Sequence, residues 1–313
     1  STFHAFCDRI LRSDGLVIGL NPRYNLMTQA ETIQFIRKNL FKFELEYYRP
    51  LGNPNKFIEG MLQHFSRLKD EDVTPNQYLE WTQNKKLKIK NQKHISKIKN
   101  IEMEDENLKN YLELANAYKK YEELKAGEGL MDFADLIANT LKLFRTRKSV
   151  LGRYRAQFKY ILVDEFQDTN YAQYALIKLL APAEQNPNLA VIGDDNQSIY
   201  KFRGAAISNI LQFMEDYKNA KQIILTKNYR SSQTILDSAY KLIKNNDPDT
   251  LEAKLGISKN LVAVRKTDKI PVEFVYKDRV ENEAEAVVRQ ITSTKSQIPN
   301  CEYKDFAILV RAN

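Results

Sequence analysis

Residues 160–170 read Tyr-Ile-Leu-Val-Asp-Glu-Phe-Gln-Asp-Thr-Asn, an apolar run followed at once by two carboxylates. A strand that is buried on both faces of a sheet is a continuous apolar run, so this pattern predicts a buried strand over residues 160–163. Open α/β sheets bind ligands at the carboxyl ends of their strands, which is where Asp164 and Glu165 would lie. One such carboxylate can hold Mg²⁺ and the next can orient or activate water, although the same pattern also fits the start of a solvated loop.

Two more apolar runs downstream predict strands of the same kind. Residues 189–192, LAVI, lead into GDDNQSIYKFRGA, and residues 223–225, IIL, lead into TKNYRSS. Polar and aromatic side chains therefore follow three successive predicted strands. This repetition favours a ligand site over unrelated solvated loops.

Five segments together resemble the motifs of one family, the UvrD/PcrA/Rep type of superfamily 1 DNA helicase. VDEFQDTN, IGDDNQSIYKFRGA and LTKNYRSS resemble its motifs II, III and IV in order and in spacing. Residues 1–7, STFHAFC, resemble its TFHxxC motif, and residues 131–136, MDFADL, resemble its DFxDL motif. The resemblance covers most of residues 1–18 and 127–235 and is weak elsewhere.

This resemblance implies an α/β fold of the P-loop NTPase class. We expect a truncated RecA-like parallel sheet, a helical insertion domain and part of a second RecA-like domain. The expected domains are an incomplete domain 1A over residues 1–18 and 127–221, the helical insertion domain 1B over 19–126, and the start of domain 2A over 222–313.

Hydrophobic spacing predicts individual elements within these domains. Apolar residues three and four positions apart predict helices over 30–40 and 107–124. Beyond residue 222, strands are predicted near 272–276 and 306–310, with a helix over 283–291 between them.

The resemblance also implies roles in ATP hydrolysis. Asp164 would hold Mg²⁺ and Glu165 would activate water. Gln197 would contact the γ-phosphate of ATP, although its amide could instead make a hydrogen bond that stabilises the loop. Tyr229 would stack on the nucleotide base, and Arg230 would reach the γ-phosphate, where a planar guanidinium suits the charge of a transferring phosphoryl group.

A second set of residues is implied in single-stranded DNA binding. These are Thr2, Phe3, His4, Phe133, Tyr200, Phe202 and Arg203. Alternating aromatic and basic side chains suit a single strand, because rings stack on bases while cations meet phosphates. The family often has Trp where this chain has Phe202, which is a smaller platform. Core burial is the alternative for the aromatic residues, and a local hydrogen bond is the alternative for His4.

Composition is consistent with a soluble DNA-binding protein. The 313 residues are 43% hydrophobic and carry a net charge of +8, which suits a polyanionic partner. Cys7 and Cys301 are too few for a disulfide framework, so a reducing, cytoplasmic location is expected. No apolar run reaches the roughly 18 residues of a membrane span, so no membrane partner is expected. Between Lys85 and Lys99 there are seven lysines and no acid. This run is either a solvated helix face or a phosphate-contacting surface.

The chain contains no G-x-x-x-x-G-K-[ST] segment, the loop and lysine that hold phosphates in P-loop enzymes. We therefore expect an internal piece of a longer ATP-dependent DNA helicase, without the motifs that precede residue 1 and follow residue 313 in the family. The complete enzyme would move 3′ to 5′ on single-stranded DNA and unwind duplex or forked DNA, whereas the piece alone would not hydrolyse ATP. Two alternatives remain. One is a RecB/AddA-like helicase–nuclease, against which GDDNQSIY argues, and the other is a DNA-binding module without a motor.

Overall fold

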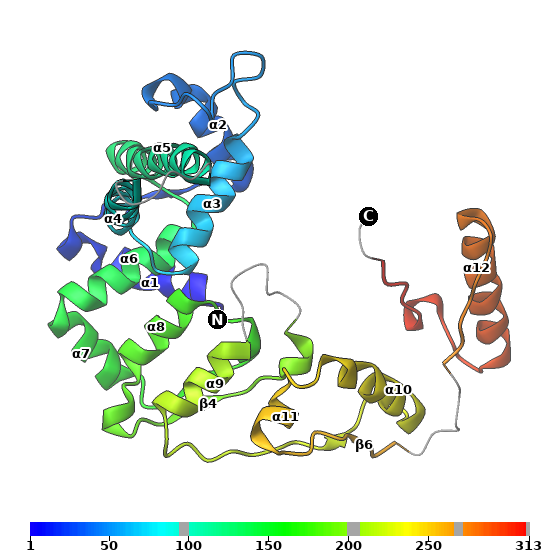
Figure 1. Cartoon of the computed structure of the whole chain (residues 1–313). Coiled ribbons are helices and arrows are strands. Elements are labelled where there is room, and N and C mark those ends of the chain that lie inside the picture. The colour runs from blue at the N-terminus through cyan, green and yellow to red at the C-terminus, as the bar shows by residue number, and fades with distance from the viewer. Residues whose placement is uncertain (94–99, 199–206, 266–271, 311–313) are drawn as a thin grey trace. The chain divides into compact units, whose positions relative to one another are not determined.

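A computed structural model describes residues 1–93, 100–198, 207–265 and 272–310 (Figure 1). The chain divides into two compact units, Ser1–Gln222 and Ile223–Asn313. No helix in the described part of the chain is long and apolar enough to cross a membrane.

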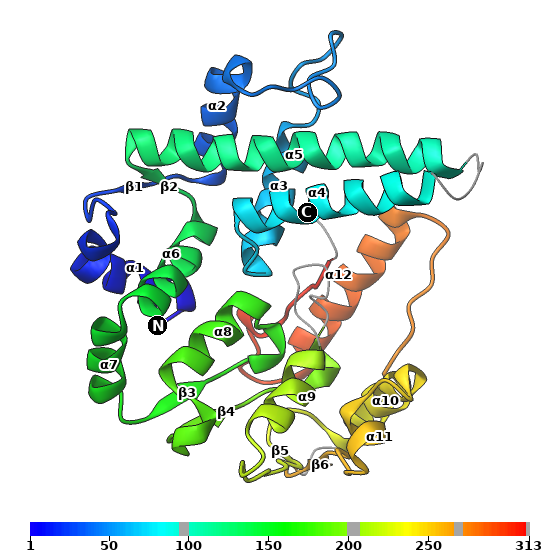
Figure 2. The ribbon, with the colours of Figure 1, turned by 60° about the vertical axis from the view of Figure 1, so that its left-hand side comes forward.

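Four helices in the first unit share one hydrophobic core. They are α2 (Gln29–Asn39), α3 (Ile58–Asp70), α4 (Pro75–Lys93) and α5 (Asn100–Glu128). The core contains Ile36, Phe65, Tyr118 and Tyr121, which are almost fully buried. The long helices α4 and α5 lie side by side in both ribbon views (Figures 1 and 2). The predicted helix over 30–40 is confirmed to within a residue, and the predicted helix over 107–124 is confirmed as part of the longer α5.

A second group of helices surrounds another core of the same unit. Its members are α1 (Phe3–Asp14), α6 (Phe133–Thr146), α7 (Lys148–Gln157) and α8 (Tyr171–Leu180). Cys7 lies inside this core, and burial raises the pKa of its thiol to about 12. The cysteine of the TFHxxC motif is therefore a protonated packing residue.

A short parallel ladder shows where the chain leaves this core and returns to it. Strand β1 (Asn25–Leu26) pairs with β2 (Leu130–Met131) in the register Asn25 to Leu130. Helices α2 to α5 lie between these two strands in sequence. The chain thus departs for the four-helix core and comes back beside its point of departure.

The two predicted strands that precede acidic residues are present. Strands β3 (Ile161–Val163) and β4 (Leu189–Val191) pair in parallel, with α8 between them in sequence. Val163 packs with residues of α8 and of α9 (Ile207–Asp216). The prediction that β3 is buried on both faces is wrong, because Leu162 is 72% exposed. Among the described residues, side chains pack only against the Val163 face.

Over its described residues, the second unit contains one two-stranded parallel ladder, β5 (Lys227–Asn228) with β6 (Val262–Ala263). Its helices are α10 (Gln233–Ile243), α11 (Leu251–Leu255) and α12 (Val280–Gln297), the last containing the predicted helix over 283–291. Short 3₁₀ helices occur in both units at Gly15–Ile18, Leu40–Lys42, Phe166–Asp168, Ala183–Gln185, Asp195–Gln197, Lys244–Asn246 and Tyr303–Asp305.

Three predicted strands of the second unit are not formed. Residues 223–225, 272–276 and 306–310 have no strand assignment, and Phe274 and Leu309 are 90% and 94% exposed. Apolar and β-branched composition makes a strand only where a neighbouring strand accepts its backbone hydrogen bonds. In the described part of this unit, that neighbour exists only for β5 and β6.

Candidate functional site

Strand pairing continues beyond β3 and β4 and brings the polar residues that follow them together. The N–H of Ile192 donates to the carbonyl of Val163, and the N–H of Phe166 donates to the carbonyl of Ile192, both at 2.8 Å. Asp164 and Glu165 therefore lie beside the start of the loop that follows β4. Both side chains are exposed and therefore accessible to a metal ion or a water molecule.

Glu165 has an unusual backbone conformation. Its φ of 50° and ψ of 43° are left-handed, a region that residues other than glycine adopt infrequently. The N–H of Glu165 donates to Oδ1 of Asp164 at 3.0 Å, which closes the turn.

A buried glutamine connects the two strand ends. Gln167 is 1% exposed; its Nε2 donates to Oε2 of Glu165 at 2.6 Å, and its Oε1 accepts the N–H of Asp194 at 3.0 Å. A Cβ at Gly193 would lie 2.9 Å from Oε1 of Gln167, so a larger residue there would displace the Gln167 amide. Sequence reasoning missed Gln167. The signal available was a neutral amide, both donor and acceptor, two residues after the acid.

Gln197 joins the same group of hydrogen bonds. Its side chain is exposed, and Nε2 donates to Oδ2 of Asp194 at 3.0 Å. The loop-stabilising hydrogen bond considered for Gln197 is thus present. The structure brings Asp164, Glu165 and Gln197 to adjacent strand ends, linked through Gln167 and Asp194.

Tyr229 and Arg230 follow β5 in the second unit, and both side chains are exposed. The turn that carries them is shaped by Asn228, whose Oδ1 accepts the N–H groups of Arg230 at 2.9 Å and Ser231 at 2.8 Å. Asparagine commonly makes such turns by bonding the backbone two residues on. That preference could have identified Asn228, which sequence reasoning did not single out.

The predicted DNA-binding residues near the N-terminus divide into two roles. Oγ1 of Thr2 accepts the N–H of Ala5 at 3.2 Å and caps α1, while Phe3 packs partly into the core. His4 and Phe133 lie together, with their ring centroids 6.1 Å apart in an edge-on arrangement. Burial lowers the pKa of His4, so its ring is neutral at pH 7. Phe133 is 51% exposed, so the alternative of core burial is not observed.

Several predicted residues fall outside the described part of the chain. Tyr200, Phe202 and Arg203 lie there, as do the lysine side chains from Lys86 to Lys99. Of that lysine run, only the side chain of Lys85 is described. Its Nζ lies 5.1 Å from the ring centroid of Trp81 and 5.3 Å from that of Tyr111, both cation–π contacts.

Two family models cover nearly the whole chain. The UvrD/REP helicase N-terminal domain matches residues 1–218, and the UvrD-like helicase C-terminal domain matches residues 223–313. The chain belongs to the UvrD/REP helicase family. This agrees with the resemblance in its motifs and with its α/β fold of helices and short parallel ladders.

Curated relatives of this UvrD/REP-family chain are ATP-dependent DNA helicases named PcrA. The chain is 34% identical over 320 residues to that of Leuconostoc citreum, 37% over 314 residues to that of Staphylococcus epidermidis and 35% over 313 residues to that of Staphylococcus aureus. Each match includes 100% of this chain but only 36–37% of the relative. The chain thus spans about a third of the length of these helicases.

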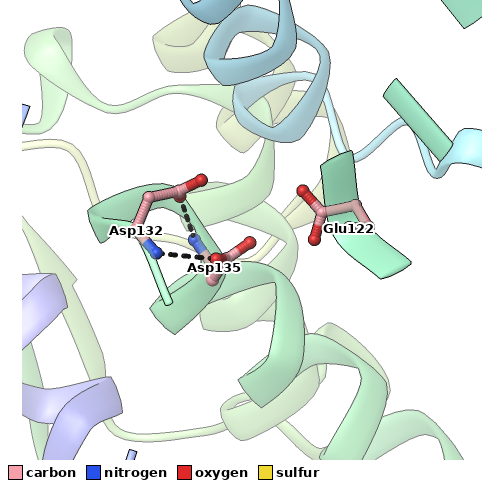
Figure 3. A group of neighbouring side chains, drawn as sticks. All are labelled: Glu122, Asp132 and Asp135. Carbon is pink, nitrogen blue, oxygen red and sulfur yellow. Dashed lines mark hydrogen bonds between the residues drawn. The ribbon is translucent and has the colours of Figure 1, made fainter. Parts of the chain in front are cut away.

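The DFxDL motif of this UvrD/REP-family chain contributes to a second acidic group, away from β3. Glu122 of α5 faces Asp132 and Asp135 at the start of α6 (Figure 3). Three carboxylates this close suggest a metal site, but two lysines lie among them. Nζ of Lys69 and of Lys125 are each 2.5–2.9 Å from oxygens of all three acids. We call these five residues the buried charge cluster.

Opposing effects set the pKa values in the buried charge cluster. Burial alone would raise the pKa of Asp132 and Glu122, but the two lysines outweigh it and lower both. Burial alone would lower the pKa of Lys69, but Asp135 and its neighbours raise it well above its usual value. Lys69 therefore stays charged, and the ammonium groups of the two lysines lie among the three acids where a metal ion would otherwise lie.

Proposed function

We propose that this chain is the central part of an ATP-dependent DNA helicase that translocates 3′ to 5′ on single-stranded DNA and unwinds duplex or forked DNA. The observation that carries the proposal is the hydrogen-bond chain from Glu165 through buried Gln167 to the backbone of Asp194. It fixes a carboxylate against two parallel strand ends. Such positioning matters because phosphoryl transfer depends mainly on alignment and electrostatics. The names of the PcrA relatives support the same activity.

The exposed acids would divide the work on ATP. Asp164 fits Mg²⁺, which is commonly held by one or two carboxylates together with phosphates and waters. Mg²⁺ at Asp164 would neutralise phosphate charge. Glu165 would orient and activate the attacking water, and Gln197 would contact the γ-phosphate through its amide. Tyr229 would stack on the nucleotide base, while Arg230 would contact the γ-phosphate.

DNA would be bound by a separate set of side chains. Phe133 and His4 support this role because their rings lie edge to face and the Phe133 ring is exposed, and such a ring can stack on a base. Thr2 and Phe3 would contribute from the same end of α1. The motif residues Tyr200, Phe202 and Arg203 complete the proposed set.

The 313-residue chain alone should not hydrolyse ATP, because it contains no Walker A loop to hold the phosphates. We place the complete helicase in the cytoplasm. In the domain division proposed from the sequence, Asp164, Glu165 and Gln197 belong to domain 1A, and Tyr229 and Arg230 belong to domain 2A.

The test is Glu165→Gln in the complete helicase. Without the carboxylate, ATP turnover stimulated by single-stranded DNA should fall by about 10²- to 10⁴-fold, the usual contribution of a general base. The thermal unfolding temperature should not change, because Glu165 is exposed. Glu184→Gln, the same change at an exposed acid of a 3₁₀ helix, is the control and should leave turnover intact. Full activity in Glu165→Gln would refute the proposal.

A further inference from the structure

Phe133 is the first residue of α6 and lies inside a closed capping box. The N–H of Asp135 donates to Oδ1 of Asp132 at 3.0 Å, and the N–H of Asp132 donates to Oδ2 of Asp135 at 2.7 Å (Figure 3). Reciprocal bonds of this kind fix the backbone at a helix start. The backbone position of Phe133 is therefore set by the two carboxylates on either side of it.

The ring of Phe133 has little packing of its own. It is 51% exposed, whereas Leu136 and Ile137, one turn further along α6, are 2% and 3% exposed. Its edge-on contact with His4 is the ring contact that it makes among the described residues. Because a half-exposed ring is not held by a core, its direction depends on the turn from which it projects.

That turn is held from outside by residues distant in sequence. Lys69 lies at the end of α3, 63 positions before Asp132, and donates to Asp132 at 2.8 Å and to Asp135 at 2.5 Å. Lys125 of α5 donates to the same two carboxylates at 2.7 and 2.5 Å. Each acid of the capping box thus accepts hydrogen bonds from the backbone at the start of α6 and from lysines of two other helices, α3 and α5.

Stability of the fold alone does not require ion pairs between these helices. Replacing a buried ion pair by apolar residues of similar size is often neutral or stabilising, so a buried charge cluster is weak support for a purely stabilising role. What ion pairs give is directional fixation, because an ammonium group must point at its carboxylates. Here the fixed object is the turn that carries Phe133.

We propose that the buried charge cluster positions Phe133 for contact with a base of single-stranded DNA. The lysines of α3 and α5 would then set the geometry of a DNA contact that is made by α6. The inference rests on the proposed function, in which Phe133 meets DNA. Lys69 and Lys125 are positioning residues in this scheme, and Phe133 is the contacting residue.

The experiment is a double-mutant cycle on the 313-residue chain with fluorescently labelled oligo(dT). One arm is Phe133→Ala, and the other is Glu122→Gln combined with Lys125→Met. The second arm removes one negative and one positive charge, both from α5, and leaves the capping box of α6 in place. Arg145→Gln is the matched control, because Arg145 joins α6 to Asp72 near the end of α3 without touching the cluster.

Phe133→Ala should weaken binding by roughly 5- to 150-fold in the wild-type background, the range for loss of one stacked base. In the Glu122→Gln/Lys125→Met background the same change should cost less than about twofold, because a misdirected ring has no stacking to lose. In the Arg145→Gln background it should cost the full amount. The salt dependence of binding should be equal in the wild type and the cluster variant, since phosphate contacts are unchanged.

Two results would overturn the inference, and they are distinguishable. Equal costs of Phe133→Ala in the wild-type and cluster backgrounds would show that the cluster does not position the ring. No cost in the wild type would show that Phe133 is not a DNA contact, which refutes its role in the proposed function as well. If Glu122→Gln/Lys125→Met does not fold, Lys125→Arg replaces it. That variant keeps the charge but changes the geometry, and additive costs there would equally reject the inference.

Discussion

Asp164 and Glu165 stand exposed beyond β3, whereas Asp132 and Asp135 lie at the start of α6 with two lysines bonded to them. Both pairs belong to helicase motifs and both follow a short strand. The first pair has no lysine or arginine ion-pair partner within the described residues, while the second pairs with two lysines. The acids beyond β3 can accept a cation and a water molecule, whereas the acids of the cluster are already bonded to lysines and join three helices.

The position of the counter-charge thus separates chemistry from architecture in this chain. Buried carboxylates require partners that the fold itself provides, because isolated buried charge is very costly. Exposed carboxylates are stabilised by water and can wait for a ligand to bring the positive charge. In the proposed function, the positive charge near Asp164 and Glu165 therefore comes from Mg²⁺ bound with the nucleotide and from the side chain of Arg230.

Replacing Arg230, the arginine proposed to contact the γ-phosphate, should have the largest effect on activity. In the complete helicase, Arg230→Ala should lower ATP turnover by about 10³- to 10⁵-fold, the contribution of an arginine that stabilises charge on the transferring phosphoryl group. Arg230→Lys should not restore it, because the planar fork is lost. Turnover and nucleotide affinity would be measured together. Arg289→Ala, on the exposed face of α12, is the control. Equal losses in affinity and rate would assign Arg230 to ground-state binding.

The architectural half of the comparison is tested by Lys69→Met. Removing one partner from a buried ion pair leaves uncompensated charge, so the free energy of unfolding in urea should fall by about 3–5 kcal/mol. Lys69 has a side-chain exposure of 4%. Lys120→Met is the matched control: Lys120 is 43% exposed and 3.8 Å from Glu123, so its loss should cost less than about 1 kcal/mol. Equal effects of the two substitutions would mean that the cluster is hydrated.

A third acid lies between these extremes and should have the smallest effect. Asp70 at the end of α3 is half-buried and accepts a hydrogen bond from Asn170 Nδ2 at 2.7 Å. Burial, with the nearby Glu71, raises the pKa of Asp70 to about 6. A pKa raised on folding means that the folded state binds the proton more tightly. Its stabilising contribution is therefore complete below pH 4 and is lost as the pH rises through 6.

Asp70→Asn keeps an acceptor for Asn170 and removes the titration. Relative to wild type, the variant should be more stable at pH 8 by about 1 kcal/mol, a figure reduced for solvent screening, and not at pH 4. Urea unfolding at the two pH values measures the difference. Glu59→Gln, at an exposed acid in the first turn of the same helix, serves as the control. A stability difference that does not depend on pH would contradict the assignment.

The sequence predicts those helices and strands whose formation depends on residues close together in the chain. Strand β3 follows from the run before Asp164, and α2 and α5 follow from apolar spacing. Gln167 was missed because its contact with Asp194 is set by the pairing of β3 with β4, which no local pattern encodes. Lys69 was missed because a lysine side chain ordinarily faces solvent. Its partners are more than 50 residues away in sequence, so only the packed structure shows that it is buried.

The left-handed backbone of Glu165 has a consequence for how this protein can change. Glycine suits that conformation better than any acid, since a side chain there strains the backbone by about 1 kcal/mol or more. Selection for thermal stability alone would therefore favour glycine at position 165, and selection for ATP hydrolysis would favour the acid. Consensus or stability-driven redesign of this domain should hold residue 165 fixed, because the change that best relieves the turn also removes the proposed water-activating group.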